Sequence, residues 1–534
     1  MAGDIALRKS YSTALMFLLF FAVLWALHVP LLRLPYFWDE AGYYVPAARD
    51  LLLHGTLIPH STPSNAHPFL VLAYLALAWK VFGFSPLVTR TAMLAAAAFS
   101  LLGLFRLAQR VANTEVAIAS VLCTALYPVF FAQSSLAHLD LATAGLTFWG
   151  LLVYVEKRPW TAAVWFSLAV MAKETAILAP LALFGWELMK PLLGKRWKAL
   201  NSSPLFESKS FALLLPAIPL ALWYAFHYAH TGFVFGNPEF FRYNVSATVQ
   251  PLRILLALGL RLWQVVGYLN LSFLTVAGLL AMLLPALRDN GEERKRIAVD
   301  VQFSFLAVTA AYVIVMAVIG GAELARYMLP VVPLVILLFV STLRRRVRLW
   351  RGVVVLVALA FVEALFVNPP HGFSVEDNLA YRDFIQLHQH AEEFLEAHYP
   401  SAHVLTAWPA NDELTVPYLG YVTKPMRVLR IEDFTIEQLM AASALRSDFD
   451  VALVFSTKYD PPHPWFERWR TWQGWKTRFF GYHRDLPAAA AAQILGGRLV
   501  YEDLRPGQWI GVIEMEQIQD AKVFETPANS LPRR

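Results

Sequence analysis

The sequence has few charged residues and a single cysteine. Charged side chains make up 16% of its 534 residues, whereas a soluble protein of this length usually has about a quarter. The one cysteine, Cys123, lies inside an apolar run, which excludes an intrachain disulfide and a cysteine-based metal site. The sequence also lacks internal repeats and low-complexity tracts, apart from the short LPAAAAAQ at 486–493.

Apolar residues are abundant instead. They make up 57% of the chain, and the mean hydropathy is +0.47. They recur in runs of roughly 18 to 25 residues, the length that crosses the hydrocarbon core of a bilayer. The sequence therefore predicts a polytopic α-helical membrane protein with about eleven spans. Its net charge of +6 does not indicate a nucleic-acid partner, because the basic residues fall where cytoplasmic loops need them.

The charge distribution sets the predicted topology. Arg8 and Lys9 precede the first apolar run, which lacks a signal-cleavage pattern and is interpreted as a span that starts in the cytoplasm. The run at 67–84 is short, aromatic and contains Lys80, so we expect it to lie in the interface. Asp39 and Asp140 then share the outer face. The predicted spans are about 11–35, 87–107, 115–135, 141–155, 160–172, 175–189, 210–229, 253–287 (with an interfacial piece), 298–319, 328–343 and 352–367.

The composition changes at about residue 369. Strand-like runs, AHVLTAW (402–408) and FDVALVFS (449–456), alternate with helical pieces such as IEDFTIEQLMAASALR (431–446). We therefore expect two domains: a transmembrane catalytic module at 1–368 and a soluble α/β domain at 369–534. The topology places the second domain outside the cytoplasm, which is the periplasm if the host is bacterial.

Two adjacent acids follow the first predicted span. Asp39 and Glu40 precede AGYYVPAARDLLLHG (41–55), whose apolar spacing predicts a helix lying in the membrane interface. The plain alternative is a solvated cap at the end of a span. Asp140, in SSLAHLD (134–140), lies just before another apolar run and could equally be an ordinary loop acid.

Charged residues also occur within or beside later apolar runs. Lys173 and Glu174 interrupt WFSLAVMAKETAILAPL (165–181), where a charge is costly and usually faces a cavity or a partner; a mutually neutralising pair is the alternative. Arg326 and Tyr327 stand at the outer end of a span, where a snorkelling anchor is the alternative.

Taken in order, these motifs resemble the GT-C glycosyltransferases of the protein O-mannosyltransferase and lipid A aminoarabinose transferase (ArnT-like) group. The resemblance covers about residues 11 to 345. It rests on the acidic pair, the interfacial helix, His67-Pro68, Asp140, the KE pair and RYMLPVVPL (326–334). It departs from the group at Phe69, where a second proline is common, and no motif aligns in the C-terminal domain. The resemblance implies an enzyme that takes a sugar from a polyprenyl-phosphate carrier outside the cytoplasmic membrane.

Transfer from such a donor needs a base for the acceptor and cations for the leaving phosphate. We expect Asp39 to be the base, Glu40 to position the acceptor or share the proton, and Asp140 to assist, as the resemblance implies. The expected phosphate-binding residues are Lys173, Arg326, His67 and Tyr327, with Glu174 and His138 as supporting residues. An interfacial histidine without a role is an equal interpretation of His67. A divalent metal ion, held by Asp39 and Asp140 with His138 as a further candidate ligand, stays open.

One displacement at the anomeric carbon would invert its configuration, as the group implies and as one evident base suggests. The acceptor, whether protein, lipid or glycan, is left open.

Two other classes of function also stay open. A transporter or flippase would have a similar number of spans, but its charges should lie near the bilayer midplane, in paired halves. A non-catalytic relative could keep the fold without the chemistry. Multi-pass insertion in the inner (cytoplasmic) membrane is expected in every case.

Overall fold

The computed structural model describes residues 2–194, 208–242, 248–461 and 468–516. The chain divides into two compact units: Met1–Gln386 with Tyr459–His483, and Leu387–Lys458 with Arg484–Arg534. The division falls inside helix α17 (Ala380–His398). The domain boundary predicted between 368 and 369 lies before this division and stays a prediction.

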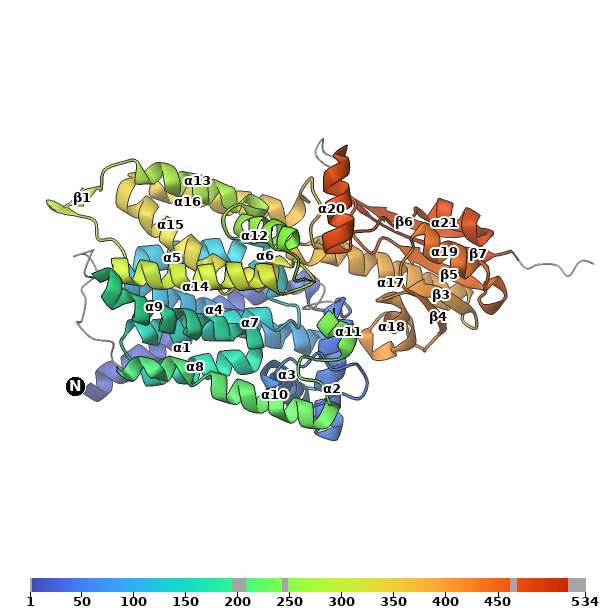
Figure 1. The fold of residues 1–534 in the computed structure, drawn as a ribbon, viewed down its shortest axis with the longest axis horizontal. Coiled ribbons are helices and arrows are strands. Elements are labelled where there is room, and N and C mark those ends of the chain that lie inside the picture. The colour runs from blue at the N-terminus through green and yellow to red at the C-terminus, as the bar shows by residue number, and fades with distance from the viewer. Residues whose placement is uncertain (1, 195–207, 243–247, 462–467, 517–534) are drawn as a thin grey trace, which may run out of the picture. The chain divides into compact units, whose positions relative to one another are not determined.

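The first unit is helical (Figure 1). Its longer helices are α1 (Ala2–Leu27), α4 (Pro86–Val111), α7 (Asp140–Val155), α8 (Pro159–Ala172), α9 (Leu178–Gly194), α10 (Ala217–Thr231), α12 (Pro251–Val266), α14 (Val299–Val318), α15 (Val332–Arg346) and α16 (Trp350–Phe366). Helix α13 (Leu271–Met282) has 12 residues. Its shorter helices are α2 (Val45–His54), α3 (Leu70–Phe82), α5 (Thr114–Leu126), α6 (Pro128–Gln133), α11 (Pro238–Phe241) and α20 (Arg470–Phe480); β1 (Arg288–Asp289) and β2 (Glu292–Glu293) form a small hairpin.

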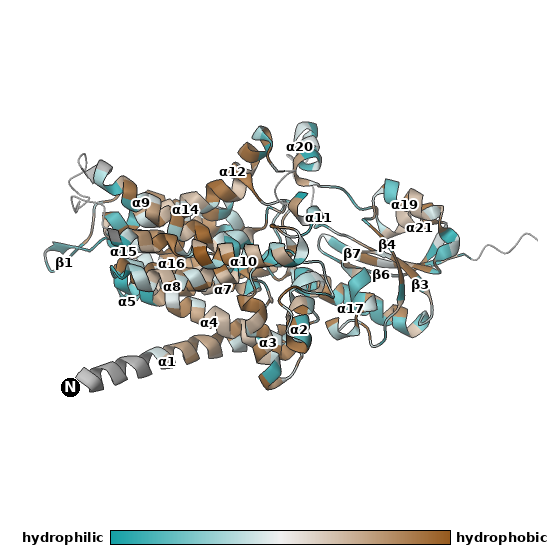
Figure 2. Ribbon diagram, turned by 60° about the horizontal axis from the view of Figure 1, so that its bottom comes forward, coloured by the Kyte–Doolittle hydropathy of each residue, from teal (hydrophilic) through white to brown (hydrophobic). Residues whose placement is uncertain are grey.

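The prediction of a membrane protein is confirmed. Within the described residues, four helical segments have the length and hydropathy of a span: Pro86–Val111, Lys209–Thr231, Pro251–Met282 and Val299–Val318. Five shorter apolar helices accompany them, and Figure 2 shows how strongly the helices of this unit are hydrophobic. The total of about eleven spans stays a prediction.

Two predicted segments gain detail in the structure. The run at 67–84 forms α3, which has 13 residues and is therefore about 20 Å long, shorter than a hydrocarbon core of about 30 Å. This length suits the predicted interfacial position. The run at 253–287 is two helices, α12 and α13, separated at Leu269 and Asn270, whose φ angles are 45° and 68°.

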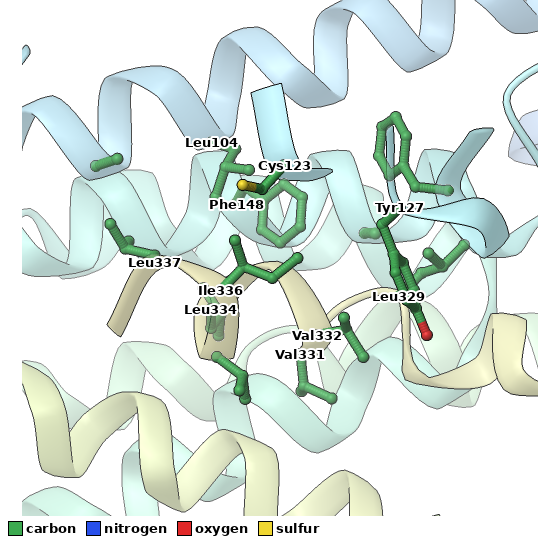
Figure 3. Packing of buried hydrophobic residues seen from close by; sticks show 14 of the residues in the cluster. Leu104, Cys123, Tyr127, Phe148, Leu329, Val331, Val332, Leu334, Ile336 and Leu337 are labelled. Carbon is green, nitrogen blue, oxygen red and sulfur yellow. The ribbon is translucent and has the colours of Figure 1, made fainter. Parts of the chain in front are cut away.

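The core of the first unit is a large cluster of buried apolar side chains. Figure 3 shows its centre, where Leu104 of α4, Cys123 of α5, Phe148 of α7 and Ile336 of α15 pack together. Cys123 is fully buried there and is a free thiol, as the single cysteine requires.

Helices α4 and α7 approach closely at Gly145. A Cβ atom on Gly145 would lie 2.1 Å from the Ser100 hydroxyl oxygen, so only glycine fits at this contact. The same hydroxyl lies 3.2 Å from the carbonyl oxygen of Leu141, in the first turn of α7. The contact therefore helps to fix the start of α7, where Asp140 lies.

The second unit is an α/β structure. Its five-stranded sheet has the order β4-β3-β5-β7-β6, in which β3 is parallel to β4 and β5, and β7 is antiparallel to β5 and β6. The strands are β3 (His403–Ala407), β4 (Arg427–Ile431), β5 (Val451–Phe455), β6 (Gly497–Arg505) and β7 (Gln508–Met515), and the further helices are α18 (Ala410–Thr415), α19 (Ile436–Ser443) and α21 (Ala488–Leu495). The strands predicted at 402–408 and 449–456 are confirmed as β3 and β5, whereas β4 and the β6–β7 hairpin were not predicted.

Candidate active site

Arg326 is the centre of a buried charged cluster. It lies in the short helix η7 (Ala325–Met328), between α14 and α15. Its guanidinium donates to Asp39 and, at 2.5 Å, to Glu376, and its Nε lies 3.3 Å from an oxygen of Asp140. Three carboxylates therefore surround one arginine. A snorkelling anchor would keep its head group in water, so that alternative is wrong for Arg326, whose side chain is 2% exposed.

Lys173 is the second cation of the cluster. Helix α8 ends at Ala172, and Lys173 itself is extended (φ −158°, ψ 135°). This break directs its amine onto Asp140, at 2.6 Å. Asp140 opens α7, where a negative charge is favoured by the helix dipole. The Lys173 amine also lies 4.1 Å from the centre of the Tyr327 ring, so Tyr327 contributes a cation–π contact.

Exposure distinguishes Asp39 from the other charged groups. The side chains of Asp140, Lys173, Arg326 and Glu376 are at most 4% exposed, whereas that of Asp39 is 21% exposed. The preceding residue, Trp38, has a φ of 44°, a conformation that costs about 1–3 kcal/mol for a residue other than glycine. This backbone turn presents Asp39 at the accessible edge of the cluster.

Glu40 has a different environment from its neighbour, and the predicted role in acceptor binding does not fit it. Its side chain is fully buried and paired with Arg90 of α4. Its other carboxylate oxygen accepts from the Phe37 backbone N–H at 2.8 Å. Arg90 also donates to the carbonyl oxygens of Pro35 and Ser135. Glu40 and Arg90 therefore fix the segments that carry Asp39 and Asp140. Because Glu40 is fully buried, the alternative of a solvated cap is wrong for this residue.

Glu174 and His67 form a pair beside the cluster. The His67 Nδ1 lies 2.8 Å from a Glu174 carboxylate oxygen. The alternative of mutual neutralisation between Lys173 and Glu174 is therefore wrong, because each has another partner. The ring of Tyr44 lies beside both His67 and His138: its centre is 6.1 Å from the centre of the His67 ring and 5.9 Å from the centre of the His138 ring.

Two protein groups contact the same ring nitrogen of His138. Its Nδ1 lies 2.7 Å from the side-chain oxygen of Gln133 and 3.0 Å from an Arg326 nitrogen. Asp39 and Asp140 both face Arg326, so a metal ion between them would have to displace this cation. The open question of a metal ion therefore gains no support from these contacts.

Sequence reasoning missed Glu376, Asp377 and Arg90. Glu376 and Asp377 lie in η8 (Val375–Asp377), just after α16, and the Tyr268 hydroxyl donates to Asp377 at 2.6 Å. Two acids after an apolar run are the same signal that singled out Asp39 and Glu40. Arg90 lies inside the apolar run of α4, the signal that singled out Lys173.

A second group of cations lies behind Tyr327. Arg253 and Arg261 of α12 are buried and share Glu323, at 3.2 Å and 2.8 Å. The Arg261 guanidinium also lies 5.6 Å from the centre of the Tyr327 ring. Both arginines interrupt an apolar run, and they too were missed. They add positive charge beside the site that Lys173 and Arg326 define.

Comparisons with known structures identify the fold of the chain. The structure of ArnT from Cupriavidus metallidurans bound to undecaprenyl phosphate has a TM-score of 0.53 at 13% identity, over 94% of this chain and 97% of that chain. The apo state of the same protein gives 0.50 at 14% identity, over 95% and 98%. This chain shares the fold of that ArnT structure.

The sequence comparison is consistent with the GT-C fold. The family described as dolichyl-phosphate-mannose-protein mannosyltransferase matches residues 66–223, a segment that includes His67, Asp140, Lys173 and Glu174. A search of curated protein sequences finds no match. The resemblance to the protein O-mannosyltransferase and ArnT group, inferred from the motifs, is confirmed at the level of the fold.

The charged cluster contains two acids whose pKa values are raised. Burial, reinforced by Asp39 and Asp377 and opposed by Arg326, raises the pKa of Glu376 to about 8. Burial likewise raises the pKa of Asp377 to about 7, against the hydrogen bond from Tyr268. The folded protein therefore holds protons on these groups at a pH where the unfolded chain, with a usual pKa of 4.5 for Glu376, has lost them.

This difference predicts that stability falls as the pH rises from about 5 to about 8, and then levels off, because the folded state binds more protons in that window. Melting temperatures of the detergent-solubilised protein across this range would show the fall. Glu376→Gln mimics the protonated acid and should flatten the curve; the double variant with Asp377→Asn should flatten it further. The same slope in wild type and in both variants would contradict the assignment.

Proposed function

We propose that this protein transfers a sugar from a polyprenyl-phosphate carrier to an acceptor at the outer face of the cytoplasmic membrane. The proposal rests above all on one observation: an accessible carboxylate, Asp39, lies against a buried arginine at one end of apolar helices. A base for the acceptor and a cation for the phosphate are thus adjacent. The ArnT relative of the same fold is described as bound to undecaprenyl phosphate, which supports a carrier of that chemical class.

The reaction follows from the positions of these groups. The donor phosphate would accept hydrogen bonds from Arg326 and Lys173 and so compete with Asp39 for the arginine. Asp39, released from Arg326, would take the proton of the acceptor hydroxyl. The acceptor oxygen would then form a bond to the anomeric carbon while the carbon–oxygen bond to the phosphate breaks. The two cations would stabilise the negative charge that stays on the phosphate. A single displacement would invert the configuration at the anomeric carbon of the sugar.

The remaining site residues support these steps. Asp140 holds Lys173 in place, and Tyr327 contacts Lys173, Arg261 and Arg326 through its ring. His67, paired with Glu174, and His138 would complete the wall around the phosphate. Membrane lipids surround the apolar helices, and the sheet-containing second unit is suited to acceptor handling outside the cytoplasm.

The ends of the helices support the proposed orientation. The C-terminal ends of α1, α8, α14 and α16 lead to Asp39, Lys173, Arg326 and Glu376. The opposite ends carry groups of basic residues, for example Arg344, Arg345 and Arg346 at the end of α15. A basic end is favoured on the cytoplasmic side, which leaves the candidate site on the outer side.

The direct test is to supply the purified protein with undecaprenyl-phosphate-linked, labelled sugars and envelope extracts as acceptors. The proposal expects labelled acceptor and free undecaprenyl phosphate as products. Movement of intact donor across liposomes, without cleavage, would indicate a flippase. Neither cleavage nor movement, with donors of several sugars, would indicate a non-catalytic relative. Asp289→Asn, at an exposed hairpin, is the matched control variant.

A further inference from the structure

The second unit contains a buried cluster of one histidine and two glutamates. His388 and Glu392 are one turn apart on α17, so they share a face of the helix, and Glu413 lies on α18. All three are at most 1% exposed. A nitrogen of His388 and one carboxylate oxygen from each glutamate lie within 4.8 Å of one another. Nothing in the proposed transfer reaction uses these residues.

The contacts inside this cluster leave carboxylate oxygens unsatisfied. The His388 Nδ1 lies 2.6 Å from one Glu413 oxygen and 3.8 Å from one Glu392 oxygen. Within the described residues, both oxygens of Glu392 and the second oxygen of Glu413 have no hydrogen-bond partner. The His388 ring packs edge-on against Phe455, with the ring centres 4.5 Å apart, so the surroundings are apolar on that side.

Two carboxylates in such a place need a positive charge. Burying an uncompensated carboxylate is costly. In the part of the chain that the structure describes, the ion pairs of Glu392 and Glu413 involve His388 and no lysine or arginine. A divalent cation would neutralise both acids, and imidazole nitrogen with carboxylate oxygens is a ligand set that zinc and similar transition metals accept.

We propose that His388, Glu392 and Glu413 bind a divalent transition-metal ion, of which Zn²⁺ is the reference case. Three protein ligands leave a fourth position for water. The ion would join α17 to α18 and stabilise this part of the second unit. The proposal does not depend on the transfer reaction.

The competing arrangement needs no metal. Burial, together with the neighbouring Glu413, raises the pKa of the Glu392 carboxyl well above its usual value. A protonated Glu392 beside a His388–Glu413 pair would also be close to neutral. The two arrangements predict different metal contents for the wild-type protein and different effects of Glu392→Gln on metal binding.

Metal content of the full-length protein is the first test. The protein is purified in detergent, stripped with a chelator, incubated with Zn²⁺ and analysed by mass spectrometry for bound metal. Glu392→Gln and His388→Ala should each hold about one zinc fewer per chain than wild type. His390→Ala is the matched control, because His390 lies on the same helix, is 51% exposed and lies 3.5 Å from Asp503, outside the cluster. Asp140→Asn should keep the zinc, which separates this ion from any ion at the candidate active site.

A second measurement keeps the proposal testable if the variants fold poorly. Co²⁺ added to stripped wild-type protein should give visible absorption bands that saturate at about one equivalent and that Zn²⁺ abolishes. A chelator should lower the melting temperature of wild type and of His390→Ala. Absence of both the bands and bound zinc in wild type, or zinc retained in full by well-folded Glu392→Gln, would overturn the proposal in favour of the protonated acid.

Discussion

Replacing Asp39 with Asn should reduce sugar transfer by about 10³-fold, the effect expected when a general base is removed. Asparagine has nearly the same shape but cannot take the proton of the acceptor. The fold should persist, because Arg326 keeps Asp140 and Glu376 as partners. Initial rates with a saturating undecaprenyl-phosphate sugar would measure the loss, which should fall on kcat.

Substitution of the adjacent acid, Glu40, should have a different effect. Glu40→Gln removes the charge that faces Arg90 in a fully buried pair, so it should lower the melting temperature more than Asp39→Asn does. Its transfer activity, measured well below that temperature, should suffer less. Full activity in Asp39→Asn would remove Asp39 from the mechanism. Equal losses in the two variants would mean that both acids act by holding the loop.

Replacing Arg326 with Gln should abolish transfer and also destabilise the protein. Three carboxylates, those of Asp39, Asp140 and Glu376, would lose their shared cation. Breaking a buried ion pair by removing one partner costs about 3–5 kcal/mol. The phosphate of the donor would also lose a guanidinium that can bind it through two hydrogen bonds. Melting temperature and donor binding should therefore fall together.

A second variant separates the two effects. In Arg326→Gln with Glu376→Gln, compared at about pH 9, above the Glu376 pKa of about 8, one of the uncompensated acids is neutral, so part of the lost stability should return while transfer stays absent. Arg326→Lys should keep the fold and part of the donor affinity, because the charge remains but the planar donor fork is lost. Recovery of transfer in the double variant would show that Arg326 acts only as a structural counter-ion and would contradict its role toward the phosphate.

The positions of the helices and of strands β3 and β5 could be predicted from the sequence. Apolar runs of span length predicted most helices of the first unit, and short strand-like runs predicted β3 and β5. The β6–β7 hairpin was missed: β6, GRLVYEDLR, carries four charged residues, which obscure the strand pattern, whereas β7, QWIGVIEM, carries only Glu514. The break between α12 and α13 depends on the left-handed backbone at Leu269 and Asn270. Neither leucine nor asparagine requires that conformation.

The candidate site was predicted in part. Charges beside apolar runs led to Asp39, Asp140, Lys173 and Arg326, which the structure brings together. The partners of these residues could not be read in the same way. Glu40 looked equivalent to Asp39, yet both lie at the start of a helical segment, where adjacent side chains point in different directions. Asp39 therefore meets Arg326, and Glu40 meets Arg90, fifty positions along the chain.

The sequence by itself determined that this chain resides in a membrane and which charges it places at the ends of its helices, because apolar length and local charge are properties of short segments. Only the tertiary structure decided which of those charges meet. The pairs Arg326–Asp39, Lys173–Asp140 and His67–Glu174 join residues far apart in the chain. Their formation depends on how helices pack, and no single segment encodes that packing.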